Sequence, residues 1–418
     1  MLTTLLVHAR RPVAPVPSFF ILTAASTLLY ALTFTVNLVY MVTVVGLDPL
    51  QMVLVGTVLE VTCFLFEIPT GIVADLHSRR LSILIGLVLI GCAFLLQGMV
   101  PTFAAMLAVQ LIWGVGYTFT SGATEAWITD EQGAEEMAPV FTRAQQISLG
   151  ATFAGTVAAG LLGIVDIRTP MVLSGAGFLL LAGWLVLTMP EDHFHPVPRH
   201  ERDSFEAMGR SFVGGLALVR RRAVVRSLFL ISLIAGLASE AFDRLWTVRI
   251  LKDFALPTLF GSHEPVVWFA VFSLVGTLVS LLASLAVNRI SPARVSALHP
   301  RRLLALLSAV QTAGIVGLAL SGNLWLALAA LWVKGAAEAV AIPIQAAWLN
   351  RNVESHVRAT VLSMNGQANA IGQVVGGPPL GLLGNRTSVR TTLLASAVVT
   401  VPITLIFARM KPARVEAS

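Results

Sequence analysis

The sequence predicts an all-α integral membrane protein with twelve transmembrane helices in two pseudo-symmetric six-helix bundles. Its composition is the first observation, because 56% of the residues are hydrophobic and only 12% are charged. A soluble domain carries about 25% charged residues, so this chain has too little polar surface for a body of its size in water. The other two observations are apolar runs of spanning length and short sequence matches between the two halves.

A spanning helix needs about 20 largely apolar residues. The sequence has such runs at 18–42, 50–74, 81–100, 102–127, 144–164, 169–189, 227–248, 266–287, 303–321, 324–348, 360–384 and 391–408. Helices are expected because every backbone polar group must be bonded inside the bilayer. The first run is too long for a signal-peptide core, so we expect it to be retained as the first helix.

The distribution of Lys and Arg predicts the orientation, since cytoplasmic segments are enriched in both. If the amino terminus is cytoplasmic, the outer loops hold only Arg168, Arg249, Lys252, Arg386 and Arg390. Arg244 and Lys334 lie within spans, and every other Lys and Arg lies on the inner side. We therefore expect an even number of spans and two cytoplasmic termini.

The longest polar stretch, 190–226, divides the spans six and six. We expect an amino-terminal bundle over 1–189, a carboxy-terminal bundle over 227–408 and a cytoplasmic tail over 409–418. Apolar side chains recur at helical spacing within the stretch, at Phe205, Met208, Phe212, Leu216 and Val219. With the arginines beside them, they predict an amphipathic helix on the inner leaflet.

The two halves repeat one another weakly. The stretch Gly122–Ala126 in the fourth span matches Gly335–Ala339 in the tenth, and Arg143 opens the fifth span as Arg358 opens the eleventh. Such symmetry is typical of transporters with parallel repeats, whose substrate site lies between the halves near the bilayer midplane.

The loop between the second and third spans carries a recognisable motif. It contains glycine, three residues, aspartate and then paired arginines, at Gly71, Asp75, Arg79 and Arg80. This resembles the loop motif of the major facilitator superfamily (MFS). The preceding stretch 66–70 is similar to bacterial drug-exporter-like members. The resemblance covers essentially the whole chain and implies the MFS fold, alternating access and a place in the bacterial inner membrane.

The motif has departures and an expected partner. Leu76 and Ser78 stand where the family usually has a basic residue and glycine, and Gln110 stands where drug exporters have arginine. In the family, a cytoplasmic charge cluster helps to hold the outward-facing state. We expect Arg79 or Arg80 to reach acidic groups at the inner end of the fourth span, Asp130 or Glu131, and Gly71 to allow a close helix approach. The alternative is a simple positive-inside anchor.

Charged side chains inside the spans are the main candidate site. One at the bilayer centre costs about 2.5–3.5 kcal/mol on insertion scales, so its presence suggests function. Glu240, Asp243 and Arg244 share a helix face, and Lys334 and Glu338 are one turn apart. Because the family places the seventh and tenth spans at the central cavity, Lys334 is expected to face Glu240 or Asp243. A carboxylate in low dielectric can bind and release protons. A purely structural Glu240–Arg244 ion pair is the alternative.

Other spans add weaker candidates. Glu60 lies mid-span in the second helix, and Tyr30 and Asn37 belong to a polar stripe on the first. A mostly apolar pocket with a few such polar groups suits amphipathic organic molecules. For the aromatic side chains, packing or an interfacial belt is the alternative interpretation.

The chain has no Gly-Lys-Ser/Thr phosphate loop and no metal-ligand spacing, and its histidines fall outside the predicted spans. Membrane topology explains the net charge of +6 better than nucleic-acid binding does. We expect no enzyme activity, no cofactor, no metal and no ATPase subunit, and a monomer in the lipid bilayer with a small-molecule substrate and protons as partners. The leading hypothesis is a proton-coupled exporter of amphipathic molecules, such as a multidrug efflux antiporter. A metabolite uptake or exchange carrier and a non-transporting receptor or scaffold are the alternatives.

Overall fold

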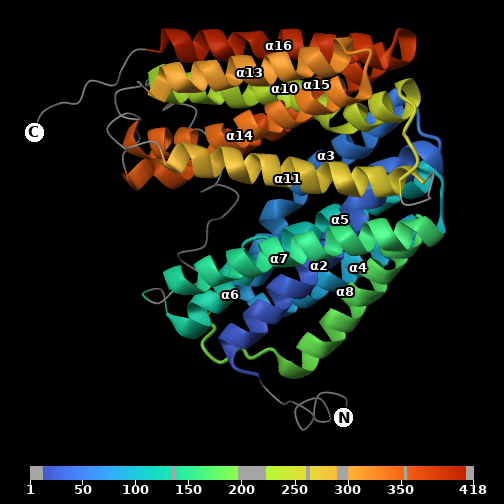
Figure 1. Cartoon of the computed structure of the whole chain (residues 1–418). Coiled ribbons are helices and arrows are strands. Elements are labelled where there is room, and N and C mark those ends of the chain that lie inside the picture. Colours follow the sequence, from blue (N-terminus) through green and yellow to red (C-terminus); the bar gives the residue numbers. More distant parts are fainter. Residues whose placement is uncertain are drawn as a thin grey trace, which may run out of the picture. The chain divides into compact units, whose positions relative to one another are not determined.

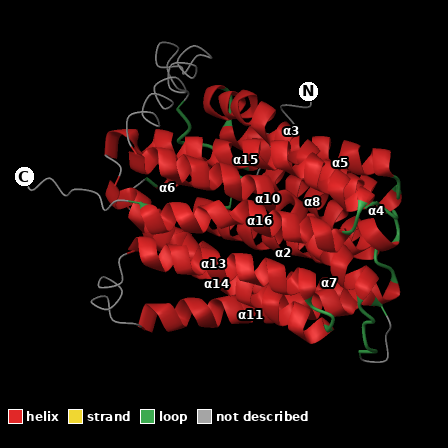
Figure 2. Cartoon of the chain, turned by 90° about the horizontal axis from the view of Figure 1, so that it is seen from above, coloured by secondary structure: helices red, strands yellow, loops and turns green. Residues whose placement is uncertain are grey.

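The computed structural model describes residues 13–133, 135, 137–195, 223–259, 264–289, 300–352 and 355–410. The predicted amphipathic face 205–219 and residues 411–418 of the predicted tail lie outside these residues. The described part of the chain is built from helices and connecting loops (Figure 2).

The first half of the chain forms seven helices within the described residues. These are α2 (Pro15–Thr43), α3 (Pro49–Leu76), α4 (Arg79–Met99), α5 (Phe103–Thr120), α6 (Ala123–Gln132), α7 (Met137–Val165) and α8 (Thr169–Thr188). The second half forms α10 (Ala223–Asp253), α11 (Pro265–Arg289), α13 (Pro300–Leu320), α14 (Leu324–Asn352), α15 (Ser355–Arg386) and α16 (Val389–Arg409) (Figure 1).

The all-α membrane fold predicted from the sequence is confirmed. Among the described residues, 11 helices are long and apolar enough to cross a bilayer, with α5 and α6 together counting as one. The remaining predicted span corresponds to α15, whose 32 residues exceed the required length but include many Gly, Asn and Gln residues and two prolines.

Two predicted helix boundaries need correction. The fourth span is not one continuous helix, because the chain breaks between α5 and α6 at Ser121 and Gly122. Gly122 has a φ of +73°, a conformation that L side chains rarely adopt. The seventh span is longer than predicted, so Arg249 and Lys252 lie in the last turns of α10 and not in an outer loop.

The chain divides into two compact units. Unit 1 comprises Met1–Leu47, Val58–Arg202 and Leu256–Ser273, and unit 2 comprises Asp48–Thr57, Asp203–Ala255 and Leu274–Ser418. Both α3 and α11 therefore contribute residues to each unit.

In unit 1, α2 packs against α7 and α8, and α4 packs against α5 and α8. Small residues let the backbones approach closely, as is common between membrane helices. A Cβ at Gly86 of α4 would lie 2.6 Å from the carbonyl oxygen of Gly116 on α5. An aromatic cluster fills the space beside these helices, and Tyr30 stacks on Phe34 with ring centroids 5.4 Å apart.

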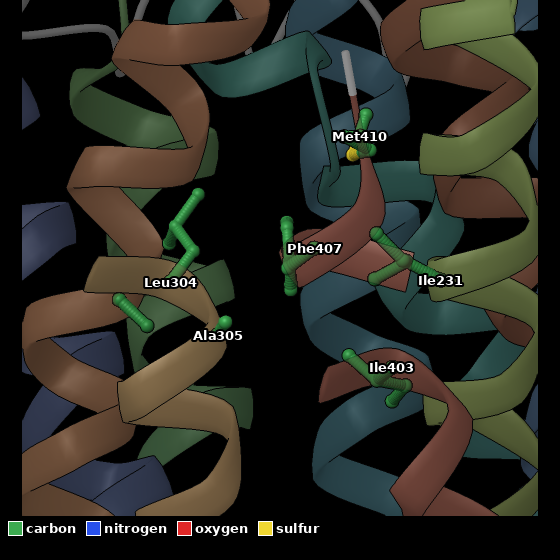
Figure 3. Packing of buried hydrophobic residues seen from close by; sticks show 7 residues of the cluster. Ile231, Leu304, Ala305, Ile403, Phe407 and Met410 are labelled. Atoms are coloured by element: carbon green, nitrogen blue, oxygen red, sulfur yellow. The ribbon is translucent and has the colours of Figure 1, made fainter. Parts of the chain in front are cut away.

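In unit 2, α10 packs against α15 and α16, and α13 packs against α14 and α16. A buried apolar cluster joins four of these helices, and Figure 3 shows its members. It consists of Ile231, Leu304, Ala305, Ala341, Ile403, Phe407 and Met410. The close α10–α15 crossing depends on Gly236, whose position leaves no room for a Cβ against the backbone of Asn369.

Candidate functional site

The acidic face predicted on α10 forms a buried ion pair in unit 2. Arg244 Nε lies 2.9 Å from Glu240 Oε1, and only 3% of Glu240 is exposed. Two glycines make room for this carboxylate. A Cβ at Gly56 of α3 would overlap Glu240 Oε1, and one at Gly377 of α15 would lie 3.2 Å from Glu240 Cγ. The structure therefore holds Glu240 in a tightly packed position among three helices.

Asp243 on the same helix has a different environment. It is exposed, unlike Glu240, although surrounding protein atoms desolvate its carboxyl group. That combination is expected of a side chain that faces an aqueous space within a protein. The charges that act on it belong to Lys334, Glu240, Glu338 and Arg244. Water can thus reach Asp243, as it can reach Glu338, whose side chain is 46% exposed.

Lys334 and Glu338 form the second predicted pair, one turn apart on α14. Lys334 Nζ lies 2.8 Å from Glu338 Oε2 and 4.6 Å from the centroid of the Phe242 ring on α10. Lys334 is therefore within electrostatic reach of Asp243, and its direct ionic partner is Glu338.

The Lys334–Glu338 pair lines a cavity of 190 Å³ inside unit 2. Helices α10, α13, α14 and α16 form its walls. Most of the lining is apolar, including Phe242 and Ile403, and Gln311 and Gln345 add amide groups. Apolar walls with a few polar groups are typical of sites for small organic molecules.

Unit 1 contains a larger and more polar cavity of 530 Å³. It lies among α2, α4, α7 and the α5–α6 break, and Tyr30 is one of the predicted residues in its wall. The exposed carboxylate of Glu125, in the first turn of α6, also lines it.

Asn37 and Glu60 lie in other surroundings. Asn37 is 6% exposed, and its carboxamide oxygen accepts a hydrogen bond from Gln97 Nε2 on α4. The Tyr40 hydroxyl donates to the carbonyl oxygen of Gln97 at 2.8 Å. Asn37 thus contributes to a buried link between α2 and α4, and its predicted place in a substrate cavity stays a prediction. Glu60 is half-buried in the part of α3 that belongs to unit 1.

The loop motif forms the expected charge cluster in part. Arg79 Nε lies 2.8 Å from Asp130 Oδ2 on α6. The two groups form an ion pair, but the geometry at Nε is not that of a hydrogen bond. Arg79 Nη2 lies 3.8 Å from Asp75 Oδ1 at the end of α3. These contacts join three helices of unit 1, which a simple positive-inside anchor does not require.

Arg80 and Glu131 form hydrogen bonds with groups other than the partners expected from the motif. The backbone N–H of Arg80 donates to Glu191 Oε1 at 2.9 Å, and its guanidinium donates to the carbonyl oxygen of Val186. The Ser78 hydroxyl also donates to Glu191, at 2.6 Å. The contacts of Glu191 could not be predicted, because a carboxylate after the sixth span carries no local signal of a contact with α4.

Glu131 instead fixes the chain that follows α8. Its Oε1 accepts the backbone N–H groups of Asp192 and His193 at 2.9 and 3.0 Å. Trp127, one turn earlier on α6, donates to the carbonyl oxygen of Pro190 at 2.8 Å. The inner end of the fourth span is therefore tied to the segment after α8.

Two other residues of the motif prediction lie apart from these contacts. Arg143 is exposed on α7 and takes no part in the ion pairs of Arg79. A Cβ added at Gly71 would meet no heavy atom within 4 Å. The close helix approach expected at Gly71 stays a prediction, and the close approaches seen within each unit lie at other glycines.

Comparison with known proteins agrees with this architecture. Residues 19–365 match the family model of the Major Facilitator Superfamily. The uncharacterised MFS-type transporter YxaM of Bacillus subtilis (strain 168) is 22% identical over 367 residues, which is 86% of this chain and 87% of YxaM.

Solved structures share the fold at low sequence identity. A mutant form of the nucleoside transporter NupG is 18% identical, with a TM-score of 0.76 over 95% of this chain and all of that chain. A D-xylose–proton symporter is 14% identical, with a TM-score of 0.67 over 94% of this chain and 98% of its own. With most of its length matched by the family model, this chain belongs to the Major Facilitator Superfamily of membrane transporters.

Proposed function

We propose that this protein is a secondary active transporter that works by alternating access and couples proton movement to the efflux of amphipathic small molecules. The observation that carries the proposal is the arrangement of charges on α10 and α14. Two ion pairs, Glu240–Arg244 and Lys334–Glu338, flank Asp243, a water-accessible carboxylate that forms no ion pair among the described residues. Charges inside a membrane protein are costly, and they commonly mark ion pathways and proton relays.

Asp243 is the proposed proton carrier. A carboxylate near an ammonium group is held in its charged form, and it becomes easier to protonate when that ammonium moves away or is neutralised. Lys334 has Glu338 as an alternative partner 2.8 Å away. A shift of Lys334 between the fields of Asp243 and Glu338 would change the proton affinity of Asp243 as the transporter changes state.

The lining of the cavity in unit 2 supports the proposed substrate class. Its walls are largely apolar and include the Lys334–Glu338 pair and two glutamines. Such a lining suits a molecule with an apolar body and a few polar groups. We also propose that the protein lies in the bacterial inner membrane, with both termini cytoplasmic, and that it works as a monomer.

An uptake carrier is the second candidate. The solved relatives include proteins described as a nucleoside transporter and a D-xylose–proton symporter. Opposite directions of transport can share one fold and one coupling carboxylate. A non-transporting scaffold is less favoured, because it has no need for Asp243 or Lys334 inside the membrane.

Dye accumulation in bacteria that lack their own exporters tests the proposal. Cells that express the protein should accumulate less of some amphipathic dyes, ethidium among them, and a protonophore should abolish the difference. Asp243→Asn at equal membrane abundance should behave as the empty vector does. If accumulation of every dye is indifferent to the protein, the efflux proposal is wrong. A rise in uptake would favour the second candidate.

A further inference from the structure

The cavity in unit 1 carries a carboxylate that no cation among the described residues neutralises. Glu125 lines this cavity and is exposed to it. In the described part of the chain its side chain forms no ion pair or hydrogen bond, whereas Asp75, Asp130, Glu131 and Glu191 all have partners. A bare carboxylate within a spanning segment calls for a ligand that would balance it.

The internal repeat shows what is missing. Glu125 occupies the position that Glu338 occupies in the second half, within the matching stretches Gly122–Ala126 and Gly335–Ala339. In unit 2, Lys334 neutralises Glu338 at 2.8 Å. The residue that corresponds to Lys334 in unit 1 is Ser121, at the same offset along the chain. The two cavities thus have equivalent acids, but among the described residues the acid in unit 1 lacks the cation that Lys334 provides in unit 2.

The remaining walls of the unit 1 cavity suit an organic cation. Tyr117 and Phe141 line it and are 46% and 37% exposed, so their ring faces are available to a ligand. Aromatic faces attract cations, and more strongly where water is excluded. Gln145 and Ser148 of α7 supply polar groups on another wall. The volume of 530 Å³ lies within the range of about 300–1,000 Å³ for sites of drug-sized molecules.

The break between α5 and α6 places the acid at this cavity. Discontinuous helices commonly supply binding groups at membrane depth in transporters. Gly122 turns the chain there, and Glu125 follows in the first turn of the new helix. Ser121, Gly122 and Thr124 line the same cavity. The corresponding part of the second half lies inside α14, which continues without interruption from Leu324 to Asn352.

We propose that the unit 1 cavity binds amphipathic organic cations, with the Glu125 carboxylate as the counter-charge and Tyr117 and Phe141 as the aromatic walls. This deepens the proposed function by naming a substrate class. The biological role of this site rests on the proposed transport function, but the binding itself can be measured without any gradient.

Equilibrium binding to the purified full-length protein in detergent tests the proposal. The probes are tetraphenylphosphonium and tetraphenylborate, which have similar size and shape and opposite charge. We expect saturable binding of the cation and not of the anion. Glu125→Gln should weaken cation binding about tenfold or more, as expected for loss of a nearby charge at an effective dielectric constant of about 20.

Three further variants keep the test independent of folding. Glu125→Asp retains the charge and should bind within a few-fold of the wild type. Ser121→Lys brings a competing cation into the same cavity and should weaken binding as Glu125→Gln does. Glu135→Gln removes an exposed carboxylate that does not line the cavity, and it should bind normally.

Several results would overturn the proposal. They are absence of saturable cation binding by the wild type, equal binding of the anion, and unchanged binding by Glu125→Gln. If dye efflux fails while cation binding depends on Glu125, the proposed transport is wrong and this site stands. If efflux depends on Asp243 but cation binding does not depend on Glu125, the proposed transport stands and the cation site in unit 1 is wrong.

Discussion

Lys334 bridges two helices of unit 2, with its Nζ 2.8 Å from Glu338 Oε2 on α14 and 4.6 Å from the Phe242 ring centroid on α10. Both contacts need the positive charge. Among the neighbouring charges, that of Lys334 has the largest effect on Asp243. A single ammonium group is therefore linked to all three side chains.

Replacing Lys334 tests this link. Lys334→Met keeps most of the length of the side chain but removes the charge, so the contact with Phe242 loses its cation–π part, about 0.5–2 kcal/mol. We expect a lower unfolding temperature in detergent and loss of proton-driven dye efflux in cells. Lys334→Arg should retain most of both. Full efflux in Lys334→Met at normal abundance would show that the charge has no part in coupling.

The Glu240–Arg244 pair predicts a non-additive double-mutant cycle. Arg244→Met leaves a carboxylate buried without its partner, a change that costs about 3–5 kcal/mol in other proteins. Glu240→Gln combined with Arg244→Met should cost less than the two single changes together, because no unpaired charge remains. Thermal unfolding of the four proteins measures the cycle, and additive effects would show that the two side chains are independent.

The α10–α15 crossing predicts different tolerance at two glycines. Gly236→Val would drive a side chain into the backbone of Asn369, whereas a Cβ at Gly366 of α15 meets no heavy atom within 4 Å. Overpacking typically costs about 1–3 kcal/mol, and more where backbone atoms must move. We expect little folded Gly236→Val in membranes and normal amounts of Gly366→Val. Size-exclusion profiles of the solubilised proteins test this, and equal yields would contradict the crossing.

The Arg79–Asp130 pair predicts rescue by charge exchange. Its side chains are 17% and 30% exposed, so the pair adds only about 0.5–1 kcal/mol to stability. Because the pair joins α4 to α6, we expect Asp130→Asn to slow dye efflux more than it lowers the unfolding temperature. Arg79→Asp with Asp130→Arg should recover part of the rate. If both variants keep the wild-type rate, the pair is an anchor alone.

Most of the fold could be predicted because the spans are long and the bilayer permits few alternatives. The pairs at Glu240–Arg244 and Lys334–Glu338 were also predictable, since side chains four residues apart share a helix face. The Arg79–Asp130 contact followed from the family motif. In each case a short-range pattern or a known motif carried the information.

Contacts between distant segments were beyond the sequence. The sequence around Glu191 and Ser78 does not indicate that they form a hydrogen bond. The sequence around Gly56 does not indicate that this glycine makes room for Glu240. The break at Gly122 was missed because a single glycine within an apolar run is compatible with a continuous helix. The role expected of Gly71 was assigned from the motif and stays a prediction.

Proton movement in proteoliposomes is the most direct test of the central claim, which is coupling through Asp243. The purified protein is reconstituted with a pH-sensitive dye inside the vesicles, and a compound identified by the cell assay is added under an imposed pH gradient. The wild type should move protons when the compound is present, and Asp243→Asn should not, although it still binds the compound. Compound-dependent proton movement in Asp243→Asn equal to that of the wild type would contradict the account.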